Sequence, residues 1–125
     1  MKLSMVGTGY VGLVTGTCLS NAGNDVICLD VDPAKVEMLR NGRSPIYEPG
    51  LDELLHHNIK AGRLSFTTNA LDAHRAADTI FISVAAPSDD RGYTDLKYID
   101  SAADSIADVL IKLGPSVKPK VVVVK

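Results

Sequence analysis

Residues 2–12 read KLSMVGTGYVG, and this stretch decides the fold. A short apolar run typical of a buried strand comes first, and a G-x-G-x-x-G turn follows it at once. Residues 10–22 then show the spacing of a helix, which Gly23-Asn24 ends. Residues 25–30 form a second apolar run that closes with an acid. We therefore predict a strand, a tight turn, a helix and a second strand, the unit from which parallel sheets are built.

The turn and the acid together favour a site for a dinucleotide. Gly7 permits the sharp turn off the strand, Gly9 lets a pyrophosphate approach the backbone, and Gly12 lets the helix pack close to the strand. Free N–H groups at the helix N-terminus attract phosphate groups. Asp30 stands 18 residues after Gly12, near the spacing expected for a carboxylate that accepts ribose hydroxyl groups. The alternative is a glycine-rich turn in an ordinary βαβ unit, which the strand, helix and acid around the turn disfavour.

Helical and strand patterns alternate along the rest of the chain. Asp32 and Pro33 suit an N-cap and a first helical residue, and we expect Asp95 to cap a long helix that Gly114-Pro115 ends. The other expected elements are helices over residues 33–40, 50–61 and up to residue 76 after a cap at Asn69 or Asp72, and strands over residues 64–67, 78–85 and 120–125. This order predicts an α/β fold, a Rossmann-type doubly wound parallel sheet. Because a sixth strand is usual, we expect a sheet truncated after the fifth strand, in the N-terminal part of a longer polypeptide.

Composition and charge narrow the class of protein. The 125 residues suffice for one domain, and we expect a single nucleotide-binding domain over residues 1–125. The net charge of −2 comes from mixed charges without a basic face, so no nucleic-acid partner is expected. The apolar runs are too short to cross a bilayer and no signal-peptide pattern opens the chain, which predicts no membrane partner and a cytoplasmic location.

Several residue types that often carry chemistry have plainer interpretations here. We expect Cys18 and Cys28 to be buried, structural thiols, because two such residues make neither a disulfide framework nor a metal site. His56 and His57 are adjacent on a predicted helix, so their side chains point about 100° apart and do not share a metal ion. Glu48 could be a catalytic acid, but a loop residue just ahead of a proline-initiated helix is the favoured interpretation. We predict no metal site.

Three blocks of the sequence resemble one family. They are residues 7–13 (GTGYVGL), residues 41–51 (NGRSPIYEPGL) and residues 87–99, which run from PS to DLKYI. The chain looks like the N-terminal NAD-binding domain of the nucleotide-sugar 6-dehydrogenases, the UDP-glucose/GDP-mannose dehydrogenase family, and most like its UDP-glucose-oxidising members. The middle block is the most specific of the three, because other Rossmann proteins do not carry it. The resemblance covers essentially the whole chain.

The resemblance implies an oxidation in two steps. The C6 alcohol of a nucleotide sugar becomes a carboxylate, and two NAD molecules each accept a hydride. The family's cysteine nucleophile and its assisting residues belong to a part that this sequence lacks, so we assign no catalytic residue and expect no turnover by these 125 residues alone. The implied partners are a nucleotide-sugar substrate and, for the full-length protein, a second copy in a homodimer.

The resemblance also implies a set of cofactor-binding residues. They are Gly7, Thr8, Gly9, Tyr10, Val11 and Gly12 at the pyrophosphate, Asp30 and Lys35 at the adenosine ribose, and Val84, Ala85, Ala86, Pro87 and Ser88 in the loop beside the cofactor. Tyr10 either packs over the cofactor or only marks the helix start. Ala86 departs from the family's threonine, so a hydroxyl is lost there, and Ser88 or a water is the replacement to consider. Because Asp30 would repel a 2′-phosphate, we expect NAD rather than NADP.

Other functions stay open at this stage. A GDP-mannose, UDP-N-acetylhexosamine, 3-hydroxyacyl-CoA or 6-phosphogluconate dehydrogenase could share the opening unit, although the block at residues 44–51 disfavours the last two. A methyltransferase also places an acid after its second strand, but the third glycine of the turn argues against it. A nucleotide-binding module without activity is a further alternative.

Overall fold

A five-stranded parallel sheet forms the centre of the computed structural model, which describes all residues from 1 to 125. Its strands lie in the order β3-β2-β1-β4-β5, the order of a doubly wound dinucleotide-binding sheet. The strands are β1 (Lys2–Val6), β2 (Asp25–Leu29), β3 (Leu64–Thr67), β4 (Thr79–Ile82) and β5 (Val121–Val124). The helices are α1 (Tyr10–Asn21), α2 (Pro33–Arg40), α3 (Leu51–Lys60), α4 (Ala70–His74) and α5 (Lys97–Leu113). The predicted fold class is confirmed.

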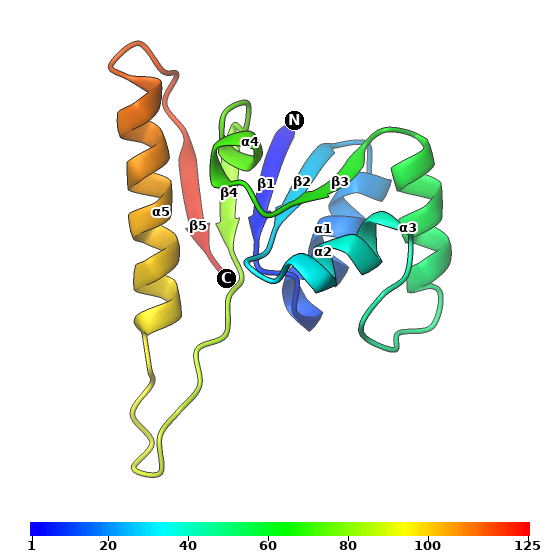
Figure 1. Cartoon of the computed structure of the whole chain (residues 1–125), viewed down its shortest axis with the longest axis horizontal. Coiled ribbons are helices and arrows are strands. Elements are labelled where there is room, and N and C mark those ends of the chain that lie inside the picture. The colour runs from blue at the N-terminus through cyan, green and yellow to red at the C-terminus, as the bar shows by residue number, and fades with distance from the viewer.

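The strand register brings several chain segments to one edge of the sheet. Val6 at the end of β1 pairs with Leu29 of β2 and with Ile82 of β4, and Leu29 pairs in turn with Thr67 of β3. The turns that follow β1, β2, β3 and β4 therefore begin at the same level. Figure 1 shows these strands between α5 at one end of the molecule and α3 at the other.

Two apolar cores cover the two faces of the sheet, because side chains alternate along each strand. The first core joins strand residues such as Met5 and Cys28 to Leu13 of α1 and to residues of α2 and α3. The second core joins Val6, Leu29 and residues of β4 to α4 and α5. The second core positions the first turns of α5 over the ends of β1 and β2, through Ala102 and Ile106.

Helical spacing in the sequence puts Val11, Val14 and Leu19, together with Gly12, Gly16 and Ala22, on a face of α1 suited to pack against the sheet, and the structure bears this out in part. Val14 and Leu19 are partly buried and pack against the first core, whereas Ala22 is exposed. The residues that are buried are Gly12, Leu13, Gly16, Thr17 and Ser20, while Val11 is 49% exposed. The small residues at helical spacing let α1 approach the sheet closely: a Cβ on Gly16 would lie only 3.0 Å from the Cys28 Sγ. Close approach, rather than hydrophobicity, selects this face.

Several element boundaries differ from the predictions. Asn69, not Asp72, caps α4, since its side chain accepts from the Asp72 N–H at 3.1 Å, and the helix ends at His74. The Asp95 side chain accepts from the Lys97 N–H at 3.0 Å, but the residue at the N-cap of α5 is Leu96. β4 ends at Ile82, so residues 83–85 belong to a loop. The cap at Asp32 is confirmed.

The two cysteines lie in different environments. Cys28 is buried, and burial raises the pKa of its thiol to about 12. Cys18 is exposed on α1, so the expectation that both thiols are buried was wrong for Cys18. On α5 the buried residues are Ala102, Ile106 and Val109, while Ile111 is 77% exposed.

One buried histidine joins α4 to β1. His74 is fully buried, and its Nδ1 lies 2.8 Å from the Ser4 Oγ. Its Nε2 has no hydrogen-bond partner. Burial and the nearby Lys120 charge lower the pKa of His74 to about 4, so the ring is neutral at physiological pH.

The outer strand β5 is poorly covered. It pairs with β4 alone, and Val121 and Val124 are each 60% exposed. None of the helices is both long and apolar enough to span a membrane.

Candidate functional site

A cleft of about 540 Å³ opens where the strands end. The lining comes from the turns after four strands and from the first half of α5. Ligands of open parallel sheets bind at this edge, outside the carboxyl ends of the strands. The lining residues are Val6, Gly7, Thr8, Gly9, Leu29, Asp30, Val31, Lys35, Thr68, Ala70, Ser83, Val84, Ala85, Tyr98, Ser101, Ala102 and Ser105.

The three glycines of the turn have separable structural roles. Gly7 has φ +98°, and a Cβ there would lie 2.6 Å from the Ser83 carbonyl oxygen. A Cβ on Gly12 would overlap the Gly7 carbonyl oxygen and lie 3.2 Å from the Ser83 Cβ. Nothing lies within 4 Å of the position that a Cβ on Gly9 would occupy. Packing thus excludes a side chain at Gly7 and Gly12, whereas Gly9 leaves open space at the N-terminus of α1.

Asp30 is a charged group of the cleft that several hydrogen bonds and one ion pair hold in place. Its Oδ2 accepts from the Thr8 N–H at 3.0 Å and from the Thr8 hydroxyl at 2.6 Å. Its Oδ1 accepts from the Asp32 N–H at 3.0 Å, and the Lys35 Nζ lies 3.5 Å from Oδ2. Burial pushes the pKa of Asp30 upward, but the hydrogen bonds and the Lys35 charge outweigh it and hold the pKa below its usual value. Asp30 is therefore ionised at neutral pH.

The predicted site residues divide into two groups. Seven of them line the cleft, namely Gly7, Thr8, Gly9, Asp30, Lys35, Val84 and Ala85. The other six lie outside its lining, namely Tyr10, Val11, Gly12, Ala86, Pro87 and Ser88. Gly12 packs against the Gly7 carbonyl group and Ser83, and so supports the turn without lining the cleft. Tyr10 is 55% exposed, and its hydroxyl donates to Glu48 Oε2 at 2.9 Å.

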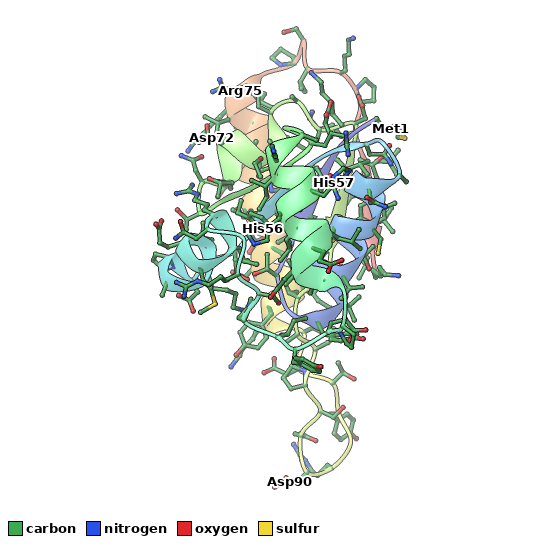
Figure 2. All side chains as sticks on the ribbon, turned by 90° about the vertical axis from the view of Figure 1, so that its right-hand side faces the viewer. Met1, His56, His57, Asp72, Arg75 and Asp90 are labelled. Atoms are coloured by element: carbon green, nitrogen blue, oxygen red, sulfur yellow. The ribbon has the colours of Figure 1, made fainter.

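The contact between Tyr10 and Glu48 ties the start of α1 to the loop before α3. The hydrogen bond to Glu48 and the Glu48 charge raise the pKa of Tyr10. The His56 ring lies against Gly42, just after α2, where an added Cβ would lie 2.5 Å from the His56 Cε1. His56 and His57 are both exposed residues of α3 (Figure 2). No group of three or more His, Cys, Asp or Glu side chains is arranged to hold a metal ion.

The loop after β4 leaves the body of the protein. Ser88 forms an isolated antiparallel bridge with Thr94, and Figure 2 places Asp90 at the far tip of this loop. Ser88 therefore belongs to the base of an exposed hairpin, away from the cleft lining. Ala86 has no hydroxyl to offer the cleft. The serine that does line the cleft in this loop is Ser83, and its hydroxyl donates to the Met5 Sδ at 3.3 Å.

The α5 wall of the cleft was not among the predicted site residues. Tyr98, Ser101, Ala102 and Ser105 all line it, and their spacing of three, four and seven residues places them on one helix face. That spacing was visible in the sequence. What the sequence did not reveal is which end of α5 lies near the strand ends, since that depends on the core that Ala102 shares with Val6 and Leu29.

Comparisons with known proteins agree with this geometry. The family described as the UDP-glucose/GDP-mannose dehydrogenase family, NAD binding domain, matches residues 1–125. The UDP-glucose 6-dehydrogenase TuaD of Bacillus subtilis is 47% identical over 109 residues, 87% of this chain and 24% of that protein. A GDP-mannose 6-dehydrogenase of Pseudomonas savastanoi pv. phaseolicola is 44% identical over 110 residues, 88% of this chain and 25% of that protein.

Solved structures give the same result. A ternary complex of GDP-mannose dehydrogenase from Pseudomonas aeruginosa superimposes with a TM-score of 0.92 at 40% identity, over 99% of this chain and 28% of that one. A UDP-glucose dehydrogenase from Pyrobaculum islandicum superimposes with a TM-score of 0.92 at 41% identity, with the same coverage. The chain spans about a quarter of the length of the curated relatives that it matches. It belongs to the UDP-glucose/GDP-mannose dehydrogenase family and is an NAD-binding domain of that family.

Proposed function

We propose that this chain holds NAD in the cleft at the strand ends, as the cofactor domain of an enzyme that oxidises UDP-glucose to UDP-glucuronate. The proposed domain is residues 1–125, and it supplies no catalytic residue. The observation that carries the proposal is the ionised Asp30 beside an open glycine turn at the N-terminus of α1. These groups match three polar parts of the cofactor, namely its two phosphates and its adenosine ribose.

In this proposal the cofactor lies across the edge of the sheet. The pyrophosphate occupies the space above Gly9, where a side chain would have no neighbour within 4 Å. The adenosine ribose meets Asp30, and Lys35 stands beside it. The adenine lies beyond Asp30, between Thr68 and the α5 wall at Ser101. The nicotinamide half runs past Val84 and Ala85, and bound NAD accepts the hydride there.

The charge of the ribose site favours NAD over NADP. A 2′-phosphate would stand against the ionised Asp30 carboxylate, which only Lys35 offsets within 4 Å. Ser88 lies outside the cleft lining, so it does not replace the threonine hydroxyl that Ala86 lacks. One missing hydrogen bond to a polar ligand group weakens binding by roughly 0.5–1.5 kcal/mol, so the affinity for NAD is reduced without being lost.

The choice of UDP-glucose rests on relatives. Three UDP-glucose 6-dehydrogenases are 47% identical to this chain, and GDP-mannose 6-dehydrogenases at 44% identity make GDP-mannose the second candidate. The reaction consumes two NAD and converts the C6 alcohol to a carboxylate. As the family resemblance implies, the whole protein is proposed to act as a cytoplasmic homodimer.

Calorimetric titration tests the cofactor proposal directly. The chain is titrated in parallel with NAD, NADP and S-adenosylmethionine, and NAD alone should give a binding isotherm. Binding of S-adenosylmethionine instead would move the chain to a methyl-transfer function, and binding of none would refute the site. The substrate is then decided with the full-length protein, by following NADH absorbance with UDP-glucose and with GDP-mannose. Faster reduction with GDP-mannose would overturn the choice of UDP-glucose.

A further inference from the structure

The Asp30 carboxylate is held mainly by one residue of the glycine turn. Thr8 donates both its amide N–H, at 3.0 Å, and its hydroxyl, at 2.6 Å, to the same oxygen, Oδ2. A hydroxyl-to-carboxylate hydrogen bond of this length is in the strong, charge-assisted range. Thr8 is only 1% exposed, so its hydroxyl is shielded from water and its rotamer is fixed by packing. The turn and the acid, which lie 22 residues apart in sequence, are thus one rigid unit.

Counting acceptor positions shows what this contact leaves free. Each oxygen of an ionised carboxylate has about two lone-pair sites. Both sites of Oδ2 are taken by Thr8, and one site of Oδ1 is taken by the Asp32 N–H. A single acceptor site therefore remains, on Oδ1. Lys35, whose Nζ lies 3.5 Å from Oδ2, is a donor for a second ribose hydroxyl.

We propose that Thr8 is a positioning residue for Asp30: its hydroxyl clamps Oδ2 so that Oδ1 receives one ribose hydroxyl while Lys35 serves the other. This inference rests on the proposed function, because it assumes that Asp30 meets the adenosine ribose. Thr8 acts on the cofactor's ribose through Asp30, whatever its backbone does for the pyrophosphate. The clamp also keeps a full negative charge facing the 2′ position, which is where NADP would carry its phosphate.

The clamp has an electrostatic consequence that a purely steric role would lack. Burial raises the pKa of Asp30, whereas hydrogen bonds, with the Thr8 hydroxyl first among them, lower it. Removing that hydroxyl therefore moves the Asp30 pKa upward. The other charged groups near Asp30 are Lys35 and Asp32 on the α2 side, and the titratable group of the opposite wall is Tyr98 on α5. None of these contacts is altered by a change confined to the Thr8 side chain.

The test compares Thr8→Val, Thr8→Ser and Thr17→Val with the unmodified chain. Thr8→Val keeps the shape and the amide donor but removes the hydroxyl, and Thr8→Ser retains the hydroxyl. Thr17→Val is the matched control, because Thr17 is a fully buried threonine of α1 whose hydroxyl has no partner. Thermal unfolding checks that each variant folds. Titration calorimetry gives the affinity for NAD and NADP from pH 5 to pH 8, and the ¹³C shift of the Asp30 carboxyl gives its pKa without ligand.

We expect Thr8→Val to bind NAD about tenfold more weakly, since a hydrogen bond to a charged group is lost. Its preference for NAD over NADP should narrow, and the decline of NAD affinity in acid should begin at a higher pH. Thr8→Ser should restore all three properties, and Thr17→Val should match the unmodified chain. Equal NAD affinity in Thr8→Val would overturn the inference. Tighter binding would also overturn it, because the hydroxyl would then compete with the ribose for Oδ2.

The carboxyl titration separates this inference from the proposed function. If the unmodified chain binds no NAD, the proposed function fails. An Asp30 pKa that is the same in Thr8→Val and in the unmodified chain would refute the clamp whether or not NAD binds.

Discussion

Replacing Gly12 with alanine should destabilise the fold, whereas replacing Gly9 with alanine should leave the fold intact and remove NAD binding. The two residues belong to one turn, but their surroundings differ. A Cβ on Gly12 would lie 3.0 Å from the Gly7 carbonyl carbon, 3.2 Å from the Ser83 Cβ, and closer still to the Gly7 carbonyl oxygen. Ordinary contacts of a Cβ begin at 3.4 Å. The obstructing atoms include backbone, so they cannot rotate away.

The size of the Gly12→Ala effect follows from these contacts. To admit the methyl group, α1 must move away from the turn, and this loosens Leu13, which is 0% exposed in the first core. Overpacking of this kind costs about 1–3 kcal/mol, and we expect the upper end because backbone is involved. Alanine gains back up to about 1 kcal/mol as a better helix former. The net loss of about 2 kcal/mol lowers the melting temperature by roughly 5–10 °C in a domain of this size.

By the same comparison of contacts and helix preferences, Gly9→Ala should change the free energy of unfolding only a little. Gly9 is the N-cap of α1 with φ −70° and ψ −172°, which is extended backbone open to alanine. Nothing within 4 Å meets the added Cβ, and alanine is only somewhat poorer than glycine at an N-cap, by about 0.5–1 kcal/mol. The methyl group fills the space above the helix N-terminus where the pyrophosphate is proposed to lie, so NAD affinity should fall below detection.

Circular dichroism during heating and NAD titration calorimetry measure the two effects separately. A Gly12→Ala protein that melts within about 2 °C of the unmodified chain would refute the packing argument. A Gly9→Ala protein that folds and binds NAD normally would refute the placement of the pyrophosphate.

Three further outcomes are expected. Asp30→Ala should weaken NAD binding and narrow the preference over NADP in parallel titrations; an unchanged preference would remove Asp30 from the ribose site. Stability in urea should fall as the pH drops from about 6.5 to 4. In this range His74 binds a proton in the unfolded chain but stays neutral in the folded chain, where its pKa is lowered to about 4. His74→Gln should flatten this dependence while His57→Gln, at an exposed position, should not; an equally steep dependence in His74→Gln would exclude His74 as its source. Finally, the chain should produce no NADH from UDP-glucose, and measurable turnover would show that catalytic groups lie within these residues.

Most of the fold could be predicted because its signals are local. Glycine turns, apolar runs and the Asp32 cap act over a few residues, and each has one structural meaning. The extent of β4 was predicted badly because Val84 and Ala85 continue the apolar character of the strand past Ser83 but leave the sheet to line the cleft. Only the pairing with β1, which ends at Val6 and Ile82, sets the true end of the strand. Such pairing is a property of the assembled sheet.

The residues of the candidate site also divide into those that local sequence signals predict and those that only the assembled fold places. Gly7, Gly9 and Asp30 could be found because their spacing is a short-range requirement of the turn and the second strand. The α5 wall could not, since its placement depends on a core that Ala102 and Ile106 share with residues of three strands distant in sequence. The contact between Thr8 and Asp30 was equally hidden, because a hydroxyl at a variable position of a motif gives no sign of its partner.

The unequal surroundings of Gly9 and Gly12 also bear on how this domain would change over evolutionary time. Folding alone would preserve Gly12, because any side chain there meets backbone. No packing contact protects Gly9, so beyond the small advantage of glycine at the N-cap, the proposed cofactor site is what would keep it. A descendant that no longer needed the cofactor would keep the shape of the turn and lose Gly9 first. The residue at this single position therefore distinguishes a working copy of the domain from a folded relic.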